Sequence, residues 1–244
     1  MSEFAKVLRL LSTAQKSAKG VSVYARYVNR PAGRLLAAAA YRIGVTPNQV
    51  TALSAVFTFS ALITVATVPP GPTMAFGVFL ALSLGFALDS ADGQLARSRQ
   101  SGSTLGEWLD HVLDCAKLAT VHMVVLISFG RFFDLSNPLY LLAPMAFQLV
   151  TIVVFFAGIL AEQLQRKQEW ERKPQQPPSA LRSLLLLPVD YGVLCVSFLF
   201  LGNRDFFLDL YVVLLVANVL FMAAFLVKQY RELSWTGRVG SPGA

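Results

Sequence analysis

The sequence has few of the residues that build disulfide frameworks and thiolate or imidazole metal sites. Its 244 residues include two cysteines and two histidines, and only 14% of them are charged. Cys115 and Cys195 stand alone in apolar stretches with no C-x-x-C spacing, which excludes a disulfide framework and a cysteine metal site. The first 24 residues are polar and basic and lack the pattern of a signal peptide. We therefore expect the N-terminus to be kept and membrane insertion to depend on internal segments.

Apolar residues, in contrast, make up 55% of the sequence, and its mean hydropathy is +0.56. This composition is too apolar for a soluble globule. A helix needs about 20 mostly apolar residues to cross a membrane. Six segments reach that length, namely Asn48–Val68, Pro72–Ala96, Thr104–Phe129, Pro138–Leu164, Ala180–Leu201 and Phe206–Val227. We predict an all-α integral membrane protein with six transmembrane helices.

Basic residues indicate how these helices are oriented. Of the 21 lysines and arginines, 18 lie before the first span, after the second, between the fourth and fifth, or in the tail. Short cytoplasmic segments carry such an excess, so both termini should be cytoplasmic. The chain then divides into a basic N-terminal segment (1–47), a transmembrane domain (48–228) and a short tail (229–244). In so apolar a chain the net charge of +7 faces anionic lipid headgroups, and we expect no nucleic-acid partner.

The segment before the first span is predicted to lie on the membrane surface as an amphipathic interfacial helix. Arg30 to Ile43 has an apolar centre with basic residues near its ends. Thr46 can cap the first span, with Pro47 as its first helical residue. Asn48 and Thr51 follow about one turn apart at the cytoplasmic end of this span. They serve either as ordinary capping groups or as ligand contacts.

Four carboxylates interrupt the most hydrophobic part of the chain, in the run DSADGQLARSRQSGSTLGEWLDHVLD. One intramembrane charge costs about 2.5–3.5 kcal/mol even on lenient insertion scales, so four charges need compensation. Asp89 and Asp92 share a helix face at the end of the second span, and Asp110 and Asp114 share one at the start of the third. A short polar connection makes these two helices antiparallel neighbours. We therefore predict a carboxylate cluster whose hard oxygen ligands favour Mg²⁺, Mn²⁺ or Ca²⁺ over zinc, with charge enough for two ions.

Two glycines and an arginine accompany the acids. Gly93 follows Asp92 directly, and Gly106 precedes the first aspartate of the third span by one turn. A glycine within a helix costs about 0.8–1.0 kcal/mol relative to alanine. Each glycine therefore indicates a need for space, either for close helix packing or for a bulky ligand such as a nucleotide. Ala96 lies one turn beyond Asp92, and the guanidinium of Arg97 suits phosphate oxygens, although it serves equally as a topology anchor.

Together these residues form a spaced motif. The pattern D-x-x-D-G-x-x-A-R, eight residues, G-x-x-x-D-x-x-x-D is matched at every fixed position, by Asp89, Asp92, Gly93, Ala96, Arg97, Gly106, Asp110 and Asp114. This closely resembles the signature of the CDP-alcohol phosphotransferases, also called CDP-alcohol phosphatidyltransferases, which are integral membrane enzymes of phospholipid synthesis. The six spans, the interfacial helix and the TPNQVT start of the first span also look like this family.

The resemblance implies a reaction and a set of roles. A CDP-linked lipid donor, with CDP-diacylglycerol expected, would lie between the second and third spans, and an alcohol hydroxyl would attack its β-phosphorus with release of CMP. The family pattern assigns metal binding, with two Mg²⁺ or Mn²⁺ ions, to Asp89, Asp92, Asp110 and Asp114, and makes Asp114 the general base. The donor contacts would be Asn48, Thr51, Asp92, Gly93, Ala96, Arg97 and Gly106. A homodimer is also implied, with its active site on the cytoplasmic side of the membrane, which is the plasma membrane in a bacterium.

The acceptor alcohol is open at this stage. Glu107 and His111 beside the motif aspartates look like the choline and ethanolamine branch of the family, although His111 points about 100° away from the metal face and serves equally as a packing residue. Lys117 and Arg182 are candidate ligands for a phosphorylated acceptor such as inositol phosphate or glycerol phosphate. The Tyr-x-x-Arg-Ala-Arg-like cluster expected of inositol-phosphate enzymes is missing. Asp190 is a further acid in an apolar stretch. We expect its carboxylate either to pair with Lys117 or Arg182 or to help shape the acceptor cavity.

Two other classes of protein fit parts of the pattern. A divalent-cation transporter would also bury aspartates, but it would place them near the bilayer midplane between structural repeats, and the sequence shows no internal repeat. A non-catalytic membrane protein accounts for the spans and leaves four aligned acids unexplained. Metal-dependent release of CMP from a CDP-linked donor would separate an enzyme from both.

Overall fold

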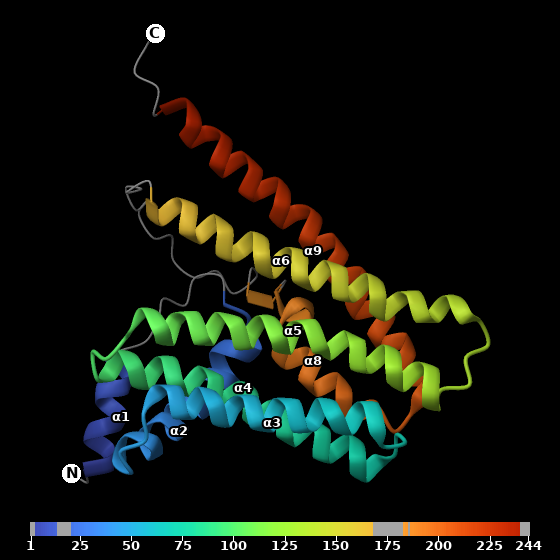
Figure 1. Cartoon of the computed structure of the whole chain (residues 1–244), viewed down its shortest axis with the longest axis horizontal. Coiled ribbons are helices and arrows are strands. Elements are labelled where there is room, and N and C mark those ends of the chain that lie inside the picture. Colours follow the sequence, from blue (N-terminus) through green and yellow to red (C-terminus); the bar gives the residue numbers. More distant parts are fainter. Residues whose placement is uncertain (1–2, 14–20, 168–182, 185, 240–244) are drawn as a thin grey trace.

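The structure is a computed structural model that describes residues 3–13, 21–167, 183–184 and 186–239, and all regular structure within these ranges is helical (Figure 1). The helices are α1 (Glu3–Thr13), α2 (Arg30–Arg42), α3 (Pro47–Thr67), α4 (Pro72–Ser98), α5 (Thr104–Phe132), α6 (Leu142–Lys167), α8 (Tyr191–Ser197) and α9 (Arg204–Val239). A π-helical turn covers Ala25–Asn29, and 3₁₀ turns cover Pro138–Leu141, Leu187–Val189 and Phe198–Phe200. The predicted all-helical architecture is confirmed, and the predicted interfacial segment forms α2.

Five helical segments are long and apolar enough to cross a membrane: Pro47–Thr67, Pro72–Ser98, Thr104–Phe132, Pro138–Gln165 and Arg204–Ser234. They correspond to five of the six predicted spans. The last helix, α9, continues to Val239, well past the predicted end of its span at Val227. An integral membrane protein is therefore the class that this architecture fits.

The remaining predicted span, Ala180–Leu201, is not one continuous helix where the structure describes it. Asp190 has an extended backbone (φ −78°, ψ 132°) and caps α8, which has only seven residues before a 3₁₀ turn continues it. Pro188, two residues earlier, has no N–H to donate and disfavours helical backbone in the residue before it. Length and hydropathy alone missed this break, because the proline and the cap interrupt a run that stays apolar.

The corner between α2 and α3 determines where α3 begins. Gly44 has a left-handed backbone (φ +78°), and the N–H of Val45 donates to the carbonyl of Ala40, so that α2 ends sharply. The hydroxyl of Thr46 then accepts from the backbone N–H of Gln49, whose side chain accepts from the N–H of Thr46. The predicted Thr46 cap is confirmed, and the first turns of α3 start at a fixed point.

Arg99 ties the end of α4 to this corner. Its guanidinium donates to the carbonyls of Val45 at 2.7 Å and Tyr41 at 3.3 Å, and it lies 5.1 Å from the centre of the Tyr41 ring. The sequence had indicated only a charge on the cytoplasmic side at this position. The contact sets the beginning of α3 beside the last turns of α4, where the motif residues lie.

The long helices α3, α4 and α5 lie side by side, and α6 and α9 follow beyond α5 (Figure 1). Helix α4 packs against α2 and α3, α5 packs against α3 and α6, and α6 packs against α9. The approach of α3 to α4 is close at Gly85, where a Cβ atom would overlap the side chain of Thr58. The hydroxyl of Ser54 also donates to the carbonyl of Gly85 at 2.8 Å. These contacts fix α4 against α3 within two turns of the acids.

Buried hydrophobic residues form two clusters. The larger cluster includes Phe129 and Phe198 and joins α3, α4, α5, α6, α8 and α9. The smaller cluster includes Leu11, Ala37 and Leu95 and joins α1 and α2 to α3 and α4. The smaller cluster therefore anchors the N-terminal helices to the part of α4 that carries the aspartates.

His122 joins three helices inside the larger cluster, and sequence reasoning did not single it out. One ring nitrogen lies 2.6 Å from the Tyr211 hydroxyl on α9, and the other lies 3.0 Å from the Thr151 hydroxyl on α6. The imidazole also stacks on Phe147, with ring centres 4.0 Å apart. An intramembrane histidine is a functional candidate by default, but here both nitrogens have partners, so its role is to hold α5, α6 and α9 together.

Candidate active site

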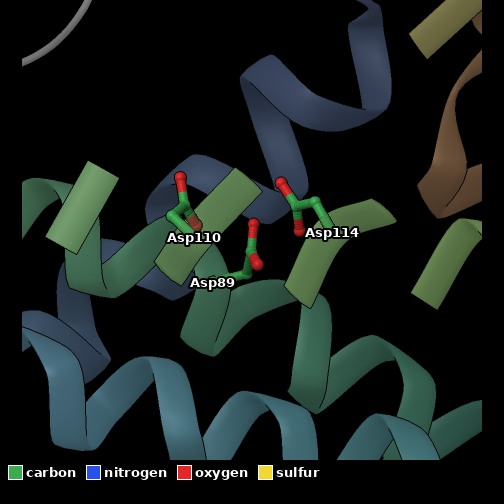
Figure 2. A group of neighbouring side chains, drawn as sticks. All are labelled: Asp89, Asp110 and Asp114. Carbon is green, nitrogen blue, oxygen red and sulfur yellow. The ribbon is translucent and has the colours of Figure 1, made fainter. Parts of the chain in front are cut away.

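Three of the four predicted carboxylates meet in one place (Figure 2). Asp89 from α4 and Asp110 and Asp114 from α5 each present an oxygen atom within 4.8 Å of the other two. Asp110 and Asp114 are four residues apart, so one face of α5 presents both to α4. Carboxylates this close repel one another unless positive charge lies among them. Since no histidine or cysteine within the described ranges joins this group, its donor set fits a hard divalent cation such as Mg²⁺ or Mn²⁺.

A lysine ammonium supplies positive charge to this group in the structure. Lys117, which is only 5% exposed, donates to the carboxylate of Asp89, to that of Asp114 at 3.2 Å and to the Ser54 hydroxyl at 3.3 Å. An ammonium has three N–H donors, so all three find an acceptor here. Lys117, which the sequence indicated as a candidate ligand of the acceptor alcohol, therefore lies against the acids and offsets part of their charge.

Asp92 lies outside this group of three. Its carboxylate accepts a hydrogen bond from the Thr51 hydroxyl on α3 at 2.5 Å and is 6% exposed. It remains within electrostatic range of Asp89 and Asp110. Thr51, for which the sequence left capping and ligand contact open, therefore orients a motif carboxylate from the neighbouring helix.

A cavity of about 690 Å³ lies beside the acids. Its lining includes every residue that the family resemblance assigned to the donor: Asn48, Thr51, Asp92, Gly93, Ala96, Arg97 and Gly106. Asp110 also lines it, as do Glu107 and His111 from α5 and Glu162 from α6. The volume lies in the range of about 300–1,000 Å³ that is typical of small-molecule sites. Glu162 was not found from the sequence, because it belongs to a different helix and to no motif.

The two motif glycines face side chains of this cavity wall. A Cβ atom on Gly93 would lie 3.2 Å from a guanidinium nitrogen of Arg97, and one on Gly106 would lie 3.1 Å from the Ser103 hydroxyl and 3.2 Å from the side-chain oxygen of Asn48. Neither Cβ would approach the backbone of a neighbouring helix. The geometry thus favours space for a ligand over close helix packing as the reason for these glycines.

A second cavity, of about 160 Å³, lies on another side of the same acids. Its lining is Thr58, Phe86, Asp89, Asp114, Lys117, Leu118, Phe155 and Tyr191. Asp89 and Asp114 therefore line the small cavity, whereas Asp92 and Asp110 line the large one. The four aspartates form a partition between two spaces of different size and chemistry.

The other residues singled out from the sequence have these places. His111 lies at the rim of the large cavity, with one ring nitrogen 3.9 Å from the Glu107 carboxylate. Asp190 accepts hydrogen bonds from the Ser22 hydroxyl and, at 2.6 Å, from the N–H of Gly192, so it caps α8 and pairs with Ser22. Arg182 lies outside the described residues.

Arg30 is the first residue of α2 and lies outside the spans. Burial, and then the neighbouring charge of Arg26, lowers the pKa of Arg30. Arg30 also acts electrostatically on Arg97 of the large cavity. Arg97 thus presents a guanidinium to the large cavity from α4, which suits an anionic ligand.

Comparisons with known proteins identify the family and a shared fold. The model of the CDP-alcohol phosphatidyltransferase family matches residues 44–227. A crystal structure of Mycobacterium tuberculosis phosphatidylinositol phosphate synthase (PgsA1) with CDP-DAG bound is similar in fold, with a TM-score of 0.53 and 19% sequence identity over 83% of this chain and 94% of that chain. The same enzyme in complex with manganese and citrate gives a TM-score of 0.54 and 16% identity over 80% of this chain and 87% of that chain. No curated protein matches the sequence.

Proposed function

Because the chain belongs to the CDP-alcohol phosphatidyltransferase family, we propose that it transfers a phosphatidyl group from CDP-diacylglycerol to the hydroxyl of an alcohol and releases CMP. The observation that carries this proposal is the partition of aspartates between a large polar cavity and a small one. A two-substrate transfer needs two spaces that meet at the reacting phosphorus. The fold shared with an enzyme whose crystal structure contains CDP-DAG supports the choice of donor.

The donor belongs in the large cavity. Arg97 would bind phosphate oxygens, while Gly93, Ala96 and Gly106 leave room for the nucleotide. Asn48, at the start of α3, would contact the nucleotide beside Gly106. Arg30, at the start of α2, would add positive potential near Arg97.

The aspartates supply the reaction centre. Asp89, Asp110 and Asp114 would hold a divalent cation, and Asp92 and Asp110 face the large cavity, where a second would lie. Bound Mg²⁺ or Mn²⁺ would polarise the phosphate oxygens and acidify the acceptor hydroxyl. Asp114 takes the proton of that hydroxyl, whose oxygen forms a bond to the β-phosphorus of the donor. The bond from this phosphorus to the bridging oxygen breaks, and CMP leaves with that oxygen.

The orientation of the chain in the membrane follows from the assignment of the donor to the large cavity. A soluble nucleotide must reach the large cavity from the cytoplasm, so the α4–α5 connection and both termini lie on that side, as the basic residues indicate. The segment around α8 would complete the bundle as a short sixth membrane element, and α2 would lie at the cytoplasmic surface. We also propose that two chains associate as a homodimer, as the family resemblance implies.

The Asp114→Asn variant tests the proposed base. We expect it to lower CMP release by about 10³-fold or more, because it removes a general base and a metal ligand together, while CDP-diacylglycerol still binds. The measurement is CMP release from purified protein in detergent, with donor affinity determined by calorimetry. The matched control is Asp134→Asn, at an exposed acid just beyond α5, which should have normal activity.

Two outcomes would count against the proposal. Normal turnover by Asp114→Asn would contradict the proposed base. Absence of CMP release from the unmodified protein with every acceptor, combined with metal uptake into liposomes, would favour a divalent-cation transporter.

A further inference from the structure

The small cavity beside Asp114 has the size and lining of a binding site for the second substrate. Its volume of about 160 Å³ is less than a quarter of the 690 Å³ of the large cavity. Drug-sized ligands occupy sites of about 300–1,000 Å³. The small cavity lies below that range, which favours an alcohol of a few heavy atoms over a bulkier phosphorylated polyol.

A buried hydroxyl in the wall of this cavity lacks a full set of partners. The Tyr191 hydroxyl is buried and makes no hydrogen bond to an oxygen or nitrogen atom in the part of the chain that the structure describes. The thiol of Cys195, a weak hydrogen-bonding group, lies beside it. Buried hydroxyls almost always have a partner, so this group points to a polar ligand atom in the cavity.

The charged groups of the lining do not suit a phosphate. Lys117 is the cation of the lining, and its three N–H donors already serve Asp89, Asp114 and Ser54. Among the described residues, the lining therefore offers a phosphorylated alcohol no cationic side chain with a free N–H donor.

Aromatic rings form much of the remaining wall. Phe86 and Tyr191 meet edge to face, with ring centres 5.2 Å apart, and Phe155 lines the same space from α6. Rings of this kind attract organic ammonium groups, and aromatic pockets that bind quaternary ammonium ligands are a common use of the interaction. The aromatic part of the wall thus favours an organic ammonium group.

We propose that the small cavity binds the acceptor and that the acceptor is a small amino alcohol without a phosphate, of the size of ethanolamine or choline. The inference rests on the proposed function and specifies its substrate class. The alcohol oxygen lies toward Asp114, which takes its proton, and the ammonium lies against the rings of Phe86, Phe155 and Tyr191. Lys117 offsets the charge of the acids and does not bind the acceptor.

An acceptor panel tests this assignment in the purified full-length protein with CDP-diacylglycerol and Mn²⁺. CMP release and the mass of the lipid product are measured with choline, ethanolamine, inositol phosphate and glycerol 3-phosphate. We expect CMP release with an amino alcohol only. Release with a phosphorylated alcohol only would overturn the inference and leave the proposed function intact, whereas release with none of them would count against the proposed function itself.

A neutral isostere tests whether the charge is recognised. The compound 3,3-dimethyl-1-butanol has the shape of choline with carbon in place of nitrogen. Cation–π attraction in a desolvated pocket is expected to favour choline at least tenfold in kcat/KM. Equal values for the two alcohols would overturn the assignment of a cationic acceptor.

Variants of two adjacent phenylalanines test the location. Phe155→Ala and Phe155→Leu should raise the KM for the amino alcohol about tenfold and leave the KM for CDP-diacylglycerol unchanged, and the leucine keeps most of the apolar volume. Phe156 is 64% exposed and lies outside the cavity, so Phe156→Ala is the matched control and should change neither constant. Tyr191→Phe keeps the ring and should raise the acceptor KM several-fold. Similar constants for the Phe155 and Phe156 variants would place the acceptor elsewhere.

Discussion

The large and small cavities share one wall of aspartates and differ in almost everything else. The large cavity is polar and is lined mainly by residues at the ends of α3, α4 and α5, most of them within the run 92–111. The small cavity is mostly aromatic and aliphatic, and its lining comes from α3, α4, α5, α6 and α8. The difference shows that one side of the site belongs to a local sequence motif, whereas the other side exists only once distant helices have packed together.

The helices that form the two sides also differ in how much of them the protein covers. In the candidate spans of α3, α4 and α5, 44%, 39% and 39% of the residues are buried, against 17% in α6 and 11% in α9. The rest of the chain therefore covers α6 and α9 on fewer sides than it covers α3, α4 and α5.

Removal of the metal should affect both cavities together and have the largest effect. Because Asp89, Asp110 and Asp114 lie within 4.8 Å of one another, we expect chelation to lower CMP release by at least about 10³-fold. Mg²⁺ or Mn²⁺ should restore it. The measurement is CMP release after treatment with EDTA and dialysis, with each metal added back. Undiminished activity in the metal-free protein would show that the partition is not a metal site.

A larger residue at Gly93 should affect the donor side alone. A Cβ atom there would lie 3.2 Å from the Arg97 guanidinium, so Gly93→Val would displace that group. We expect the KM for CDP-diacylglycerol to rise about tenfold and the acceptor KM to stay constant. Gly77→Val is the matched control, because Gly77 is an exposed glycine of the same helix where a Cβ atom would meet nothing within 4 Å. Equal changes in both KM values would contradict the assignment of the donor and the acceptor to separate cavities.

Much of the fold and of the donor side could be predicted from the sequence. Five long helices follow from apolar runs, and the large cavity brings together Asn48, Gly93, Arg97 and the other residues that the motif indicated, although their role as donor ligands stays a proposal. These inferences succeeded because helical spacing fixes which neighbours within one or two turns share a face.

Other features depend on contacts that helical spacing does not determine. Asp89 and Asp92 are three residues apart, which leaves their directions about 60° apart around the helix. That angle lets Asp92 turn to Thr51, while Asp89 joins Asp110 and Asp114. The break at Asp190 lay hidden in an apolar run. The lining by Phe155 and Tyr191 required the packing of α6 and α8 against α4 and α5.

The smallest expected effect concerns the hydrogen bond between Thr51 and Asp92. Thr51→Val keeps the shape of the side chain and removes the hydroxyl that lies 2.5 Å from the carboxylate. Hydrogen bonds to charged groups contribute about 1.5–3 kcal/mol, but part of this is recovered when the carboxylate rotates toward the large cavity and its solvent. We therefore expect the KM for CDP-diacylglycerol to rise three- to tenfold, on the order of 1 kcal/mol, with no change in the acceptor KM.

Thr67→Val is the matched control for this variant, since its hydroxyl donates only to the backbone carbonyl of Ile63 at the other end of α3. It should leave both Michaelis constants unchanged. If Thr51→Val raised the acceptor KM instead, Asp92 would act on the small cavity as well. All four aspartates would then act on both substrates. They would not divide into one pair that faces the donor and another that faces the acceptor.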